Sequence, residues 1–169
     1  RSRSLRRSWL QSSSARSAGM AGTFAAVSDD VSAIHGNPAG LALLKRQQAA
    51  TTYLNGLLDI RTEFLGYAFP LPESVSAKPS ALGASLLVSQ LGRLEVLRTN
   101  PDGSFLDERS ISAGSDIILS AAYAAQLKES VLPLPTESQE HYFGVNARYL
   151  RSTLAEQYSA SAFAMDIGY

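Results

Sequence analysis

The sequence predicts a β protein, namely the N-terminal part of a transmembrane antiparallel β-barrel, preceded by a short helical segment. Most of the chain after residue 47 alternates apolar and polar residues with a period of two, which is typical of strands. Several alternating segments are about ten residues long, the length that crosses a bilayer at a tilt. Only 18% of the 169 residues are charged, against about 25% in ordinary soluble domains.

Residues 1–17 form the first predicted segment, which is basic and contains no acidic residue. It lacks the apolar run of roughly 7–15 residues that a secretory signal requires. We therefore expect a disordered tail or a damaged export signal and build no fold on it. Its arginines are Arg1, Arg3, Arg6, Arg7 and Arg16.

Residues 18–46 form a second segment, rich in alanine and glycine, with one clear helix start. Asn37 is suited to cap a helix and Pro38 to occupy its first position. Ala39–Lys45 follow as helix formers. A helix this short is unstable alone, so we expect it to pack on another element.

Residues 47–169 form the strand region, with about six strands. Asn55-Gly56 is typical of a hairpin turn, and the polar stretch Gly92–Ser115 around Asn100-Pro101-Asp102-Gly103 predicts a long hairpin that extends two strands. The predicted strands are Ala49–Leu54, Ile60–Phe69, Leu82–Leu91, Asp116–Leu127, Tyr142–Arg151 and Ser159–Tyr169.

The two faces of these strands differ in side-chain size and polarity. One face is apolar, and the other consists mainly of serine, alanine, glycine and asparagine. This suits a barrel with lipid outside and a polar lumen. A soluble β-sandwich or small soluble barrel is the alternative. The predicted lipid-facing residues are Phe143, Val145, Tyr149, Phe163, Met165 and Ile167. The predicted lumen-facing residues are Asn146, Arg148 and Asp166, the last two on adjacent strands where they can pair.

The chain offers little catalytic chemistry. It has no cysteine, and its two histidines, His35 and His141, lack metal-ligand neighbours at useful spacing. Asp29-Asp30 is typical of a turn or cap, and no nucleophile elbow or phosphate loop occurs. We expect no catalytic residue, no metal site, no cofactor and no enzymatic activity. A net charge of zero argues against nucleic acid as a partner.

A linked set of motifs near the start of the chain resembles a known group of proteins. The set comprises Gly19-Met20, Asp29-Asp30, Ala33, Asn37-Pro38-Ala39-Gly40 and Phe64-Leu65-Gly66-Tyr67. It resembles the PorV/PorQ-like outer-membrane proteins, which are related to the FadL-like long-chain fatty-acid transporters, and a similar uncharacterised family in spirochaetes. Gly36 stands where these families usually have a bulky residue.

The resemblance implies a bacterial outer-membrane barrel of about fourteen strands, with residues 18–46 as a hatch that includes Asn37, Pro38, Ala39 and Gly40. It implies passage of hydrophobic small molecules, with outer-membrane lipid and a hydrophobic ligand as partners. The alternatives are a PorV-like component of a protein-secretion system, with secreted proteins as partners, and a soluble lipid-binding β-domain.

The number of strands bears on the extent of the barrel. About six strands cannot close a barrel, since the smallest have eight. An unpaired strand edge in lipid costs several kcal/mol for each exposed backbone group. We therefore expect the chain to be the N-terminal part of a longer barrel.

Overall fold

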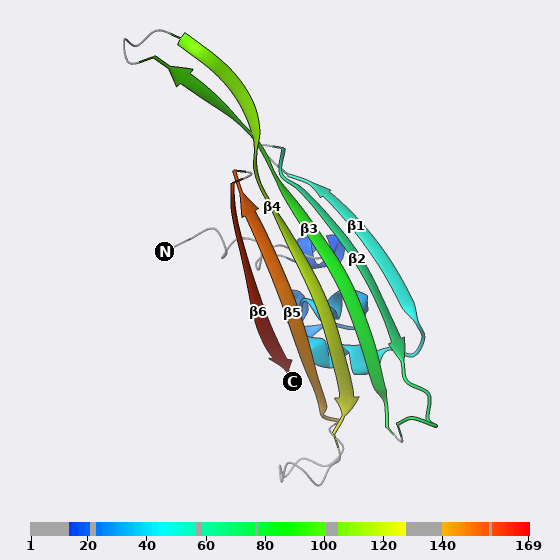
Figure 1. The fold of residues 1–169 in the computed structure, drawn as a ribbon. Helices are drawn as coiled ribbons and strands as arrows, with labels where there is room; N and C mark the ends of the chain where they lie inside the picture. The colour runs from blue at the N-terminus through cyan, green and yellow to red at the C-terminus, as the bar shows by residue number, and fades with distance from the viewer. Residues whose placement is uncertain are drawn as a thin grey trace.

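A computed structural model of the chain describes residues 14–20, 23–56, 59–76, 78–100, 105–127, 140–155 and 157–169. These residues form a mainly β structure of one antiparallel sheet and four short helices (Figure 1). The strands are β1 (Gln48–Asn55), β2 (Arg61–Pro70), β3 (Ser80–Thr99), β4 (Phe105–Gln126), β5 (Tyr142–Leu154) and β6 (Tyr158–Gly168). The helices are α2 (Ala15–Gly19), η1 (Thr23–Ala26), η2 (Val31–Ile34) and η3 (Pro38–Leu43).

The six strands follow one another in the sheet in chain order, and each pairs antiparallel with its neighbour. The prediction of an antiparallel sheet of about six strands is thereby confirmed. The sheet is open, with β1 and β6 at its two edges. The barrel itself stays a prediction.

Strands β3 and β4 are much longer than the others, at 20 and 22 residues. Their far halves leave the sheet together as a two-stranded ribbon (Figure 1). The expected long hairpin is thus confirmed. Its expected turn begins at Asn100, and residues 101–104 lie outside the described part of the chain.

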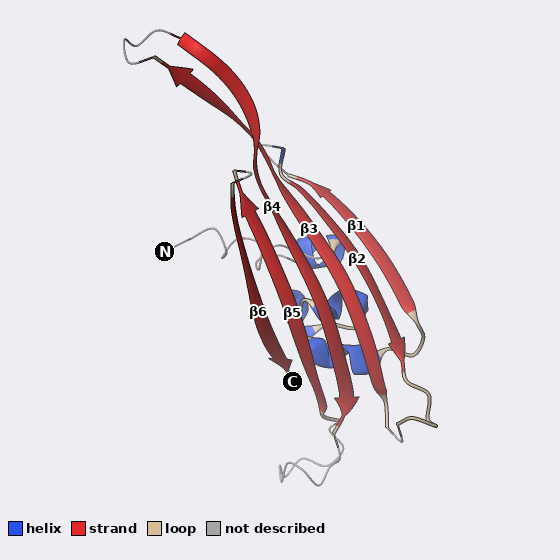
Figure 2. Ribbon diagram, in the orientation of Figure 1, coloured by secondary structure: helices blue, strands red, loops and turns tan. Residues whose placement is uncertain are grey.

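The helices lie on one side of the sheet (Figure 2). Asn37 caps η3 as predicted, since its side chain accepts a hydrogen bond from the amide of Ala39, and Pro38 is in the first turn. The expected helix over Ala39–Lys45 is wrong in type and extent, because η3 is a 3₁₀ helix that ends at Leu43. Residues 1–13 of the expected tail lie outside the described residues, and α2 crosses the expected boundary at residue 17.

The sheet has two unlike faces, which we call the covered face and the outer face. The covered face carries the helices, and its side chains are buried from β2 to β5: Thr62, Phe64, Ser85, Leu87, Ser89, Ile118, Ser120, Ala122, Asn146, Arg148 and Leu150. The outer face exposes large apolar side chains: Tyr53, Leu65, Tyr67, Phe69, Leu82, Ile117, Leu119, Tyr123, Phe143, Phe163, Met165 and Ile167.

The main core lies between the helices and the covered face. Ile34 of η2 and Leu41 of η3 are fully buried against the small side chains of the strands. At Gly83 of β3, a Cβ atom would lie 2.9 Å from Cδ1 of Ile34. The helices can therefore approach the sheet closely only because small residues face them. The strand residues of this core are Ala68, Ala81, Ala122 and Ala124.

Candidate functional site: the covered face

The C-terminal strands provide a close-fitting seat for η3. A Cβ atom at Gly144 of β5 would lie 2.4 Å from the backbone nitrogen of Ala39. One at Gly168 of β6 would lie 2.1 Å from Oδ1 of Asn37. Since these neighbours are backbone and capping atoms, only glycine fits at either position.

The motif Asn37-Pro38-Ala39-Gly40 lies at this seat. The Asn37 amide nitrogen donates to the carbonyl of Tyr169 at 3.1 Å and to that of Ala25 at 3.3 Å. A Cβ atom at Gly40 would lie 1.7 Å from the carbonyl oxygen of Ser28. The motif therefore joins three parts of the chain: the η1 segment, η3 and the end of β6.

Two polar side chains of β5 donate hydrogen bonds to the end of η2 and to the residue that follows it. The Asn146 amide donates to the carbonyl of Ile34 at 2.8 Å, and an Arg148 guanidinium nitrogen donates to that of His35 at 3.3 Å. Arg148 Nε lies 2.5 Å from a carboxylate oxygen of Asp166, which confirms that these two residues pair. All three predicted lumen residues thus lie on the covered face and form one cluster.

His35 belongs to the same cluster. Its Nε2 lies 3.0 Å from Oγ of Ser85, and its ring meets the Phe64 ring edge-on at a centroid distance of 5.5 Å. Burial, together with the positive charge of Arg148, lowers the pKa of His35 to about 4. The sequence alone did not predict this contact, because Ser85 lies 50 residues from His35 along the chain.

An apolar row crosses the covered face beside this cluster. Phe64, Leu87, Ile118 and Leu150 lie opposite one another on four successive strands, and each is at most 4% exposed. The expectation of a face of small and polar residues therefore misses this row. Its sequence signals were Leu87 and Ile118, each an aliphatic residue on the otherwise small and polar side of its strand.

The outer face carries a continuous apolar belt, defined by Phe143 to Tyr149 of β5 and the residues paired across from them. The belt ends at Arg151, eight residues beyond Phe143. That separation is about 27 Å along a strand, or about 21 Å across a bilayer at a tilt of roughly 40°. It is close to the apolar band of about 25 Å on outer-membrane barrels.

The six predicted lipid-facing residues all lie in or beside this belt. Phe163, Met165 and Ile167 of β6 are 85%, 76% and 73% exposed. Phe143 is exposed, and Val145 and Tyr149 are partly exposed. The structure thus places the two predicted sets on opposite faces of the sheet, while what each face contacts stays a prediction.

Two other features concern metals and membrane helices. Within the described ranges, no three histidine or carboxylate side chains lie close enough together to hold a metal ion. No helix in those ranges is both long and apolar enough to cross a membrane.

Comparison with known proteins gives one match. The model of an uncharacterised protein family, UPF0164, matches residues 1–72, which include the helices, β1 and β2. Neither the comparison with curated proteins nor that with solved structures gives a match. None of these comparisons names a PorV-like or FadL-like protein, so that relationship stays a prediction.

Proposed function

We propose that this chain forms part of a bacterial outer-membrane β-barrel that passes hydrophobic small molecules without covalent chemistry. In this proposal the outer face of the sheet contacts lipid and the covered face lines the lumen. Residues 18–46 form a hatch that rests on the lumen wall.

The observation that carries the proposal is the large apolar surface that the sheet exposes on its outer face. Large apolar side chains such as Phe163, Met165 and Ile167 are exposed, while Asn146 and Arg148 are buried on the covered face. Full burial of such an apolar side chain away from water is favourable by about 1.5–3 kcal/mol of free energy. Lipid against the belt would supply this gain, and its estimated height fits an outer-membrane barrel.

The choice of hydrophobic cargo rests on the apolar row of the covered face. Phe64, Leu87, Ile118 and Leu150 form an apolar row next to the segment that we assign as the hatch. Since each is at most 4% exposed, a hydrophobic molecule would contact the row only after the groups that cover it move. Asn146 and Arg148 of β5 each donate a hydrogen bond to that segment, and Asp166 of β6 positions Arg148 through an ion pair.

Membrane fractionation tests the proposal. The protein should remain with outer membranes after a carbonate wash, which removes peripheral proteins. Recovery in the soluble fraction would reject the membrane barrel and favour the soluble lipid-binding β-domain.

A secretion-system component is the second candidate, favoured by the serines that line much of the covered face, including Ser85, Ser89 and Ser120. A deletion strain separates the two functions. Reduced uptake of a radiolabelled long-chain fatty acid, with normal levels of secreted proteins, is expected for our proposal. Normal uptake with loss of secreted proteins would favour the secretion role.

A further inference from the structure

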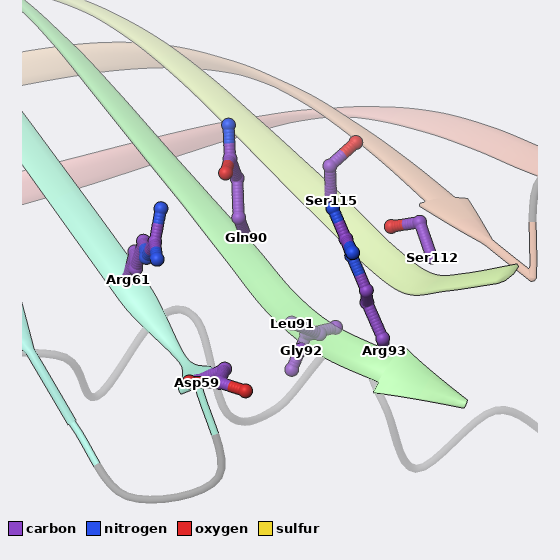
Figure 3. Close-up of a pocket in the computed structure, with 8 residues that line it drawn as sticks. All are labelled: Asp59, Arg61, Gln90, Leu91, Gly92, Arg93, Ser112 and Ser115. Atoms are coloured by element: carbon purple, nitrogen blue, oxygen red, sulfur yellow. The ribbon is translucent and has the colours of Figure 1, made fainter. Parts of the chain in front are cut away.

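We propose that a pocket at the base of the β3–β4 ribbon binds the phosphate group of a membrane lipid. This inference rests on the proposed membrane location. The pocket lies at the end of the sheet where β2 begins and the ribbon departs (Figure 3). Its volume is about 560 Å³, far more than a phosphate ion needs.

Two arginines from different strands meet at this pocket. Arg61 begins β2 and Arg93 lies where β3 enters the ribbon. Figure 3 shows Arg61 and Gln90, which lie opposite each other on β2 and β3, and Arg93, which lies three residues further along β3. Gln90 pairs with both Arg61 and Ser115, so that these polar side chains line up across three strands.

The charge of the pocket favours an anion. Among the described residues that line it, one is acidic, Asp59, and two are arginines. Among the described residues, no ion pair within 4.0 Å joins Asp59 to Arg61 or Arg93. A guanidinium presents a planar fork of donors that matches phosphate oxygens. The Gln90 amide and the Ser115 hydroxyl add neutral donors.

The neighbouring surface favours a lipid phosphate over a free one. Val88 and Ile117, which pair with each other, lie two residues from Gln90 and Ser115 along their strands. They therefore lie on the same outer face, next to the apolar belt. A lipid with its phosphate in the pocket could lay its acyl chains along that belt.

Lipid binding to the purified protein in dodecyl maltoside micelles tests the inference by native mass spectrometry. The probes are dioleoylphosphatidylglycerol, dioleoylglycerol, which has the same chains without phosphate, and inorganic phosphate. We expect the phospholipid to bind most tightly. Arg61→Ala and Arg93→Ala should each weaken its binding about tenfold, as for the loss of a charge-assisted hydrogen bond.

Two further variants serve as controls. Arg61→Lys keeps the charge but loses the fork, so it should weaken binding less than Arg61→Ala. Arg46→Ala removes an exposed arginine just before β1, at the opposite end of the sheet, and should leave binding unchanged. Far-ultraviolet circular dichroism confirms that each variant keeps its sheet.

Unchanged phospholipid binding by the Arg61→Ala/Arg93→Ala double variant would overturn the inference. Equal binding of dioleoylglycerol would remove the role of phosphate, and equally tight binding of inorganic phosphate would remove the role of the lipid. These results are independent of fractionation. A protein that washes off membranes refutes the proposed function, whereas a membrane protein with unaltered variants refutes only the pocket.

Discussion

Met165 offers the sharpest test of what the outer face contacts. It lies on β6 opposite Ala147 and is 76% exposed. Ala147 is midway between Phe143 and Arg151, the two limits of the apolar belt. If the belt spans a bilayer, Met165 lies near its midplane, where a charge is least tolerated.

The substitution Met165→Arg separates a lipid-facing side chain from a water-facing one. At a bilayer midplane, an arginine on the lipid-facing side lowers the free energy of unfolding by about 2–4 kcal/mol. At an exposed position in water, the change stays within about 0.5 kcal/mol. The two environments therefore differ by at least about tenfold in the folding equilibrium.

Ser161→Arg is the matched control, since Ser161 lies on the same strand opposite Arg151, at the edge of the belt. Arginine near an interface costs only about 0–1 kcal/mol. The measurement is urea unfolding of both variants in phosphatidylcholine vesicles, followed by protease protection. Equal stability of Met165→Arg, Ser161→Arg and the parent protein would refute the lipid assignment of this face.

Three further predictions concern the helices on the covered face. Gly144→Ala should destabilise the protein by about 3 kcal/mol, because the new methyl group meets backbone atoms. The control Gly19→Ala should be neutral or slightly stabilising, because no atom lies within 4 Å of the new methyl group. Equal urea midpoints for the two variants would contradict this prediction. Asp166→Asn leaves the buried Arg148 without its carboxylate and should cost about 2 kcal/mol, while a double variant with Arg148→Met should recover part of the loss in a double-mutant cycle. Stability should also fall as the pH drops from about 6.5 to about 4, because His35 binds a proton more readily in the unfolded chain. The loss of stability with falling pH should be smaller in His35→Gln. An unchanged loss in that variant would show that another group titrates.

The alternation of side chains along the chain determined the strands and the contents of their faces. Successive side chains of a strand point in opposite directions. Alternation therefore assigns Leu82, Ile117 and Phe163 each to the apolar face of its own strand. The Asn37-Pro38 pair likewise marked the start of η3, since capping uses neighbouring residues. Such local features need no knowledge of the rest of the chain.

Only the tertiary structure decided which residues meet across strands and helices. Register brings Phe64 opposite Leu87, and packing brings His35 to Ser85. The seat of η3 at Gly144 depends on an approach between segments more than 100 residues apart, and no local pattern reports it. These contacts are set by the sum of many weak interactions over the whole sheet, so a short stretch of sequence determines the faces of a strand but not its partners.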